Sequence, residues 1–212
     1  MSPVGGKIPR EFYARAVVLV ARECIGKVIV RRTADGEVAG RIVEAEAYRG
    51  PLDLAAHSAR GYTKRTAAMF GPPGYAYVYL LYGIHWALNL VAGAEGEPHA
   101  VLIRAIEPIR GIDLMALRRE RSSRPRAATV GAWAAREIGN GPGKLTQALA
   151  ITGADYGRDL CGEELFLGEA ESPTGRIGCS TRINVDYAGR WATRRWRFYE
   201  RGNKCVSVTP RE

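Results

Sequence analysis

Residues 74–89 of this chain read Gly-Tyr-Ala-Tyr-Val-Tyr-Leu-Leu-Tyr-Gly-Ile-His-Trp-Ala-Leu-Asn. Aromatic and β-branched residues dominate the stretch, and Tyr82-Gly83 interrupts it as a turn would, which favours a β-hairpin. With a period of two, one face carries Tyr75, Tyr77 and Tyr79, and the other carries Ala76, Val78, Leu80 and Tyr82. A large aromatic ring at a hairpin tip is costly to leave in water. The sequence therefore predicts that this tip contacts a partner.

The length and charge of the chain limit the number of domains and the kind of partner that it can have. A chain of 212 residues suits a single domain over residues 1–212 with a sizeable core. The balance of 31 Lys+Arg against 22 Asp+Glu gives a net charge of +9. That excess suggests a polyanionic partner such as nucleic acid, although a solvated basic surface also explains it. Two local clusters stand out: Arg118/Arg119/Arg121/Arg124/Arg126 and Arg190/Arg194/Arg195/Arg197/Arg201/Lys204.

The cysteines and the N-terminus indicate the compartment. Four cysteines are widely spaced, without a Cys-x-x-Cys pair, which favours buried thiols in a reducing environment. The first residues lack the apolar core of a secretion signal, and no apolar run approaches the roughly 20 residues of a membrane span. We expect a soluble intracellular protein without a membrane partner. It would be cytoplasmic, associated with the nucleoid in a bacterium or nuclear in a eukaryote.

The remaining pattern predicts an α+β domain. Helices are expected at residues 9–24, 111–121 and 144–151, with weaker helical character at 127–138 and a mixed loop at 53–70. Strands are expected at 27–32 and 40–48 around Asp35-Gly36, at 100–107 before Pro108, and in the C-terminal runs 165–167, 176–177, 197–199 and 205–208. This order predicts a largely antiparallel sheet.

The strand at 40–48 is the first candidate for chemistry. Alternation places Glu44, Glu46 and Tyr48 on one face and Val43, Ala45 and Ala47 on the other, and Asp53 and His57 follow soon after. Two carboxylates near a histidine can form an acid/base pair, two arms of a metal site, or an ordinary exposed face. Gly141-Pro-Gly-Lys144 lacks the spacing of a phosphate-binding P-loop, so a plain turn explains it better than a helix N-terminus near a phosphate.

Many short motifs occur together in a fixed order. They are Gly40-Arg-Ile-Val-Glu-Ala-Glu-Ala-Tyr48, Ala55-Ala-His57-Ser58, Met69-Phe70, Pro73-Gly74, Tyr77-Val-Tyr79, Tyr82-Gly83, Asn89, Val101-Leu-Ile-Arg104-Ala-Ile-Glu-Pro108, Gly141-Pro142, Lys144-Leu145, Gln147-Ala-Leu-Ala-Ile151 and Arg197-Phe-Tyr199. In this order they resemble the alkyladenine (3-methyladenine) DNA glycosylase family over nearly the whole chain.

The resemblance implies a monofunctional base-excision enzyme that flips alkylated or deaminated purines out of double-stranded DNA and cuts their N-glycosidic bond. It implies one compact domain with a curved, largely antiparallel sheet, flanking helices and a protruding hairpin that inserts into DNA. A monomer is expected. No metal or organic cofactor is expected, because a cationic alkylated base leaves without the help of a strong acid.

The resemblance also implies roles for single residues. Glu46 matches the general base that activates a water, and a carboxylate can also stabilise an oxocarbenium-like transition state. The base pocket is matched by Tyr48 and His57 on one wall, Tyr79 on the opposite wall, Asn89 against the 2-amino group of guanine, and Arg104 near the flipped nucleotide. Tyr82 matches the residue that intercalates where the nucleotide leaves the duplex. Glu44 is expected to be structural.

The chain departs from the family pattern at three places. Arg65 is followed by Thr66 where an Arg-Asn pair is usual, Ile84 stands where some relatives have Met, and Asn184 occupies a position often held by Gly. Two other functions remain open from the residues. One is a non-catalytic module that binds damaged DNA, and the other is a metal-dependent hydrolase using Glu44, Glu46, Asp53 and His57.

Overall fold

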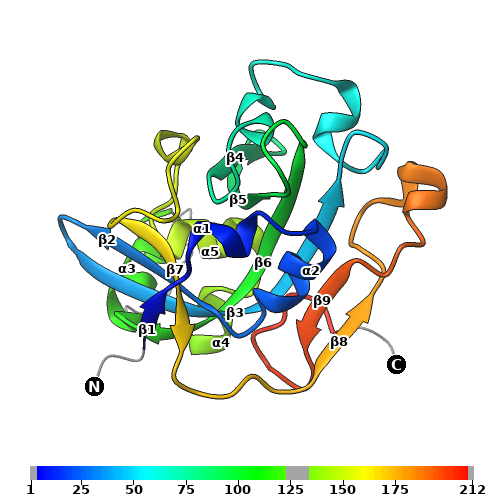
Figure 1. Cartoon of the computed structure of the whole chain (residues 1–212). Coiled ribbons are helices and arrows are strands. Elements are labelled where there is room, and N and C mark those ends of the chain that lie inside the picture. The colour runs from blue at the N-terminus through cyan, green and yellow to red at the C-terminus, as the bar shows by residue number, and fades with distance from the viewer. Residues whose placement is uncertain (1–3, 123–133, 210–212) are drawn as a thin grey trace.

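One long strand, β3 (Gly36–Arg49), organises the fold (Figure 1). The structure is a computed structural model that describes residues 4–122 and 134–209. β3 pairs with β2 (Val28–Thr33), with β6 (His99–Arg110) and, over Glu44–Glu46, with β9 (Arg197–Glu200). Residues 44–46 therefore have a strand on each side, and their backbone lies in the interior of the sheet.

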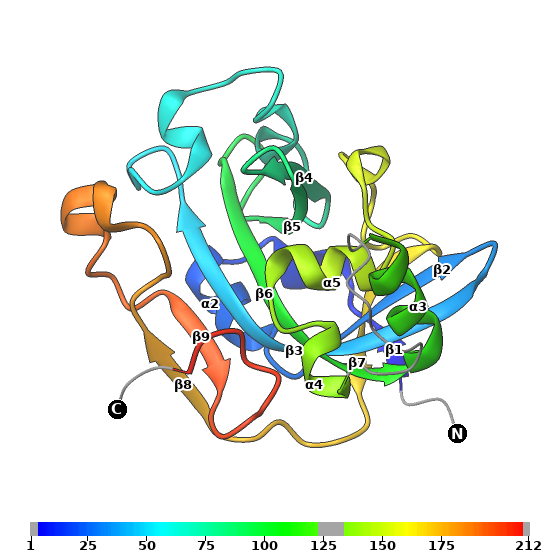
Figure 2. The ribbon, with the colours of Figure 1, turned by 180° about the vertical axis from the view of Figure 1, so that it is seen from behind.

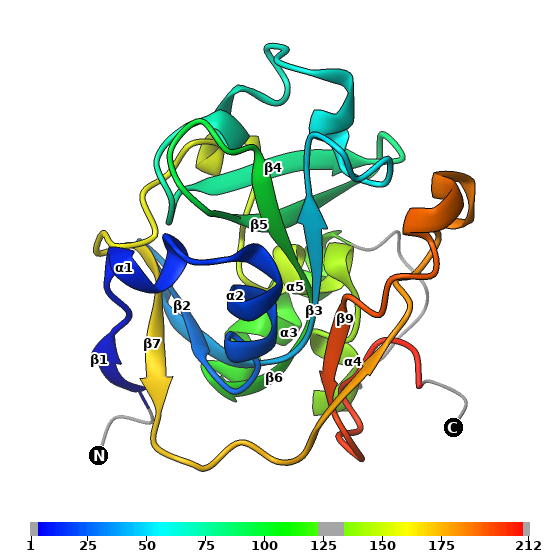
Figure 3. The same cartoon turned by 45° about the vertical axis from the view of Figure 1, so that its right-hand side comes forward.

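The sheet is antiparallel at every strand pair in the described residues. Its order is β1-β7-β2-β3-β6-β5-β4, with β8 joined through β9. The other strands are β1 (Val4–Lys7), β4 (Ala76–Leu81), β5 (His85–Ala92), β7 (Leu165–Ala170) and β8 (Ile177–Ser180). Figure 3 shows β4 running across the view while β3 and β7 run along it, so the sheet is strongly curved without closing into a barrel. The predicted α+β class and the antiparallel sheet are confirmed.

Helices and sheet share one main hydrophobic core. α2 (Val17–Glu23), α3 (Ile112–Ser122) and α5 (Pro142–Ala148) bury Val20, Met115 and Leu145 against strand residues such as Ile42 and Ile103. Figure 2 shows α3, α4 (Ala135–Ile138) and α5 grouped together. Short 3₁₀ turns complete the chain: η1 (His57–Arg60), η2 (Ala67–Phe70), η3 (Gly153–Asp155) and η4 (Asp186–Trp191). No helix in the described ranges is long and apolar enough to cross a membrane.

The β4–β5 hairpin has the two faces that the sequence predicts. Ala76 and Val78 join the main core, whereas Tyr75, Tyr77 and Tyr79 pack in a separate cluster with Met69. The turn has positive φ at both central residues, +51° at Tyr82 and +71° at Gly83, and the N–H of Ile84 donates to Leu81 O at 3.1 Å. This is a type I′ turn, which matches the twist of a hairpin. The tip of the hairpin is exposed to solvent: the exposed fraction is 77% for Tyr82 and 71% for Ile84.

Three sequence expectations about element boundaries are wrong. The single helix at 9–24 is two short helices, α1 (Arg10–Tyr13) and α2, because the backbone of Ala16 is not helical. The strand at 100–107 continues past Pro108, which lies opposite Gly40 at a register irregularity, where a missing N–H is tolerated. Residues 205–208 form no strand; the N–H of Ser207 bonds to Glu44 and the carbonyl oxygen of Val208 to Arg197. In the region of the predicted helix at 127–138, residues 127–133 lie outside the described residues.

A register irregularity also changes the two faces of β3. The pairing with β6 shifts on both sides of Glu44, so that Val43 has no partner on β6 and Arg104 has none on β3. Val43 consequently packs with Ala105 and Cys205, away from the main core that holds Ala45 and Ala47. The expectation that these three side chains share one face was wrong at Val43, because an extra residue in a strand breaks the alternation.

The two basic clusters are partly structural. Arg118 is 6% exposed and donates to Asp35 Oδ1 at 2.6 Å and to Ala148 O at 3.3 Å, and Arg119 is also buried. Arg124 and Arg126 lie outside the described residues. In the second cluster Arg197 is buried, while Arg190, Arg194 and Arg195 are exposed. A phosphate-binding role for Arg118 is therefore not supported. All four cysteines are free thiols, and two of them, Cys24 and Cys205, are buried.

Candidate active site

A row of side chains crosses the sheet on one face. Glu46 on β3 pairs with Leu102 on β6, Leu102 pairs with Asn89 on β5, and Asn89 pairs with Tyr77 on β4. Directly opposed residues in antiparallel strands point to the same face. The sheet thus brings four residues that are far apart in the sequence into one line.

A pocket of about 330 Å³ lies over this row. Six of the residues expected at the site line it: Tyr48, His57, Tyr79, Tyr82, Asn89 and Arg104. Glu46 is fully buried and does not line the pocket, but three lining residues hold its carboxylate. The structure therefore brings every expected site residue together, with Glu46 directly behind the pocket wall.

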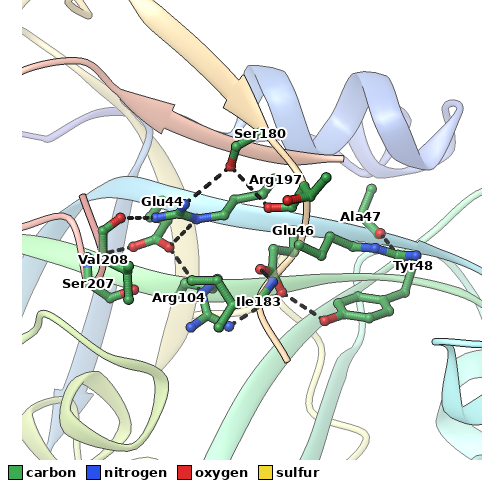
Figure 4. Close-up of polar contacts among 12 residues, drawn as sticks. Glu44, Glu46, Ala47, Tyr48, Arg104, Ser180, Ile183, Arg197, Ser207 and Val208 are labelled. Atoms are coloured by element: carbon green, nitrogen blue, oxygen red, sulfur yellow. Dashed lines mark hydrogen bonds and ion pairs between the residues drawn. The ribbon is translucent and has the colours of Figure 1, made fainter. Parts of the chain in front are cut away.

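The Glu46 carboxylate is fixed by three donors (Figure 4). Oε1 accepts the backbone N–H of Ile183 at 2.8 Å. Oε2 accepts the Tyr48 hydroxyl at 2.7 Å and lies 3.4 Å from Arg104 Nη1. A carboxylate oxygen can accept about two hydrogen bonds, so Oε1 retains capacity for a further donor.

Tyr48 is held as a neutral phenol. Burial, followed by the charge of Glu46, raises the pKa of Tyr48 well above its ordinary value. Its ring packs against the guanidinium of Arg182, which lies 4.7 Å from the ring centroid. Arg182 in turn binds the buried carboxylate of Asp53, with Nη2 2.9 Å from Oδ1. Asp53 therefore acts at a distance from the pocket, by fixing the cation behind Tyr48.

His57 lies on a different side of the pocket from the one expected. Its ring packs edge-on against Tyr79 with centroids 4.5 Å apart, and its Nδ1 lies 2.9 Å from the Tyr77 hydroxyl. A base cannot lie between two rings in such contact, so His57 and Tyr79 form one wall together and do not face each other. The expected pairing of His57 with Tyr48 was wrong, because η1 brings His57 onto the tyrosines of β4.

The Asn89 amide has a fixed orientation. It is 3% exposed, and its Nδ2 donates to the carbonyl oxygen of Tyr77 at 3.0 Å. The bond runs between cross-strand partners, so the hairpin itself holds the amide against the floor of the pocket. A rigid polar group of this kind can discriminate between the edges of bound bases.

The four residues of the metal-site alternative do not converge. Glu44 bonds to Arg104 and Arg197, Asp53 bonds to Arg182, and His57 bonds to Tyr77. Within residues 4–122 and 134–209, no three His, Cys, Asp or Glu side chains are grouped so that they could hold a metal ion. The donor atoms that the alternative needs are committed to arginines and a tyrosine.

Sequence reasoning missed the contribution of residues 183–187. Ile183, Asn184, Val185 and Tyr187 line the pocket, and the N–H of Ile183 binds Glu46. The one signal was Asn184 at a position often held by Gly: its φ is +57°, a conformation that Gly and Asn adopt most easily. Tyr187, 72% exposed, carries no periodic or spacing signal that could have marked it.

Thr66, the first departure from the family pattern, closes the loop beside the pocket. It is buried, its Oγ1 accepts the N–H of Thr63 at 2.9 Å, and it donates to Gly61 O at 3.1 Å. The guanidinium of the preceding residue, Arg65, lies over the ring of Tyr79 at 5.3 Å from the centroid. Thr66 therefore bonds within the loop that carries Arg65 against the aromatic wall.

The His57 environment predicts a pH dependence of stability. Burial, and then the charges of Arg65 and Arg60, lower the pKa of His57 from 6.5 to about 4. Between these values the unfolded chain binds a proton that the folded protein does not, so the free energy of unfolding falls as the pH drops from 6.5 to 4. Denaturant titrations should show a shallower dependence in His57→Asn over this window. Equal slopes in the two proteins would contradict the assignment.

The chain is similar to known proteins over nearly its full length. The family model described as methylpurine-DNA glycosylase matches residues 11–204. A relative from Anaeromyxobacter sp. (strain Fw109-5) is 48% identical over 207 residues, covering 97% of this chain and 95% of its own. One from Methanocella arvoryzae is 47% identical, covering 94% and 95%, and one from Clostridium acetobutylicum is 42% identical, covering 97% and 100%. Each of the three is named "Putative 3-methyladenine DNA glycosylase". The chain belongs to the methylpurine-DNA glycosylase family.

Proposed function

We propose that this protein excises damaged purines from double-stranded DNA by hydrolysing the N-glycosidic bond, with Glu46 activating the attacking water. The damaged nucleotide would flip into the 330 Å³ pocket, and the product would be an abasic site. The position of Glu46 carries the proposal: it is a buried carboxylate in register with the floor of an aromatic pocket, fixed by Ile183 and Tyr48. Preorganisation of this kind places a base at the reacting carbon without further ordering.

The geometry of the carboxylate supports a role as general base. Oε2 is occupied by the Tyr48 hydroxyl and faces Arg104, whereas Oε1 accepts the Ile183 N–H and, among the described residues, contacts neither of these two groups. A water bound to Oε1 could transfer its proton there while its oxygen attacks C1′ of the flipped deoxyribose. The same negative charge would stabilise the oxocarbenium-like transition state.

The aromatic walls suit a purine that carries a positive charge. Tyr79 already holds the planar cation of Arg65 over its ring in the free protein. Cations bind electron-rich rings with about 0.5–2 kcal/mol, depending on desolvation. A purine alkylated on its ring is also a planar cation, and it is a good leaving group without strong protonation. The pocket would thus favour alkylated bases at both binding and chemistry.

The lining of the pocket supports simple hydrolysis. No lysine is among the residues that line it in the described part of the chain. A glycosylase that also cleaves the DNA strand needs an amine that forms a Schiff base, and lysine is the usual source. The reaction would therefore stop at the abasic site.

The hairpin tip supports insertion into the duplex. Tyr82 has a positive φ, which costs a bulky residue roughly 1–2 kcal/mol, and its ring is left in water. The free protein gains nothing evident from this arrangement, so a partner that the ring contacts explains it best. Filling the gap left by a flipped nucleotide would offset the few kcal/mol that unstacking costs.

Glu46→Gln tests the chemistry directly. Glutamine keeps the shape of the side chain but cannot accept the proton, so we expect base release to fall about 100- to 10,000-fold. The assay follows base release from duplexes carrying 3-methyladenine or hypoxanthine, with binding of the same duplexes as the control for folding. Full activity in the variant would refute the mechanism, and no release by the wild type would refute the function. Tight lesion binding without release would identify a binding module instead.

Tyr82→Asn should change stability and binding in opposite directions. Asparagine accepts a positive φ more easily than tyrosine, so the free energy of unfolding should rise by about 1 kcal/mol. Binding to lesion-bearing duplex should weaken, and binding to single-stranded substrate should weaken less. Tyr82→Phe is the control, since it keeps both the ring and the strain. Equal losses on duplex and single strand would refute insertion.

A second cavity, of about 420 Å³, gives the DNA backbone a place to bind. It adjoins the pocket through Ala55, His57 and Tyr187, and its cations are Arg60 and Arg65. A nucleotide whose base occupies the pocket must carry its phosphates alongside, and this cavity is basic and next to it.

Salt dependence tests the phosphate contacts. Each phosphate contact contributes about 0.9 to the slope of log K against log salt concentration. In duplex binding, Arg60→Gln and Arg65→Gln should each reduce the slope by about that amount. Arg32→Gln, on the far end of the β2–β3 hairpin, is the matched control and should not change it. Unchanged slopes in the first two variants would assign both arginines to solvent.

A further inference from the structure

A second carboxylate, Glu44, is buried two residues before Glu46 and takes no chemical part in the proposed reaction. It is 0% exposed, and its two oxygens accept three hydrogen bonds (Figure 4). Oε1 accepts Arg104 Nε at 3.1 Å and Arg197 Nε at 2.7 Å, and Oε2 accepts the backbone N–H of Ser207 at 2.6 Å. A buried charge is costly unless it is fully paired, so a hydrophobic residue would serve simple packing better.

The contacts of Glu44 determine how Arg104 is presented to the pocket. Arg104 lies at the register irregularity of β6, and its guanidinium joins two carboxylates: Nε to Glu44 and Nη1 to Glu46 at 3.4 Å. Because the guanidinium is planar, a bond at Nε fixes the direction of both Nη atoms. Arg104 also lines the pocket, so its orientation decides what a bound nucleotide meets.

Glu44 is in turn held by the C-terminal segment, which Figure 4 shows on the side opposite Tyr48. Arg197 on β9 binds Glu44, the hydroxyl of Ser180 at 3.2 Å and the carbonyl oxygen of Val208. Ser207 supplies its N–H to Glu44, while its own Oγ is buried without a partner in the described residues. The backbone at position 207, and not its side chain, is therefore what Glu44 uses.

We propose that Glu44 is a positioning residue of the active site, and that the C-terminal segment around Ser207 completes the site by fixing Glu44. The chain of contacts runs from Ser207 N–H to Glu44, from Glu44 to Arg104, and from Arg104 to Glu46 and the pocket. This inference rests on the proposed function, because it assigns a role within the same reaction. The proposal adds Ser207, which does not line the pocket, to the residues on which the site depends.

Glu44→Gln tests the positioning role under single-turnover conditions with enzyme in excess over lesion-bearing duplex. We expect the maximal rate of base release to fall about 10- to 100-fold, as misplacement by about 1 Å can cause. The enzyme concentration that gives the half-maximal rate should stay within about twofold of wild type. If Glu44 had only a structural role, the variant would contain fewer folded molecules. The enzyme concentration that gives the half-maximal rate would then rise, and the maximal rate would stay unchanged.

Glu200→Gln is the matched control. Glu200 is also a buried carboxylate, on β9, and it binds Arg41 with Nη2 2.7 Å from Oε2, without contact to Arg104. The control should lower the temperature of unfolding and leave the maximal rate unchanged. An equal fall of the maximal rate in both variants, or no fall in Glu44→Gln, would overturn the inference.

The backbone donor is tested at position 207. Ser207→Pro removes the N–H that Glu44 accepts, whereas Ser207→Ala keeps it. We expect Ser207→Pro to lower the maximal rate in the same way as Glu44→Gln, and Ser207→Ala to match wild type. In the Glu44→Gln background, Ser207→Pro should cause no further loss, because the segment acts through Glu44. Additive losses would show that it acts by another route.

The outcomes separate this inference from the proposed function. If the wild type releases no base, the proposed function fails before any variant is compared. If the wild type releases base and Glu46→Gln does not, the proposed function stands. The maximal rates of Glu44→Gln and Ser207→Pro, each divided by that of the wild type, then test the positioning role independently.

Discussion

The structure depends on pairing two buried carboxylates of one strand in the interior of a sheet. Glu44 and Glu46 are both fully buried, and β6 and β9 flank them with Arg104 and Arg197. Two arginines balance the two glutamates, and each carboxylate accepts hydrogen bonds at both oxygens, which is the kind of pairing that allows such groups to be buried. The irregular register, the position of β9 and the binding of residues 207–208 can all be understood as ways of bringing donors to these two groups.

The sequence predicted well wherever periodicity carried the information. The alternation in the β4–β5 hairpin correctly placed Tyr77 and Tyr79 on one face and Val78 on the other. Alternation failed at Val43, because the residues of one strand do not reveal where a residue will be left without a partner on the next strand. For the same reason the sequence could not place His57, whose wall is decided by how a 3₁₀ turn packs on another strand. Charge clusters misled at Arg118, since a run of arginines looks the same whether it faces solvent or Asp35.

The site combines a rigid part with an exposed one. Glu46, Asn89 and Tyr48 lie on paired strands and have fixed hydrogen bonds. Tyr82 and Tyr187 stand at the mouth of the pocket and are largely exposed. Such a division suits the proposed function: the exposed rings would meet the duplex, and the rigid residues would meet the nucleotide after it has left the stack.

The row from Glu46 to Tyr77 has a consequence for folding errors. A slip of one residue between β3 and β6, or between β5 and β4, would turn Glu46 or Tyr77 toward the hydrophobic core and core residues toward the pocket. A misregistered chain would bury unpaired charge and could not persist as a folded species. Folded molecules with a scrambled pocket should therefore be absent from preparations of this protein, and the active fraction should equal the folded fraction.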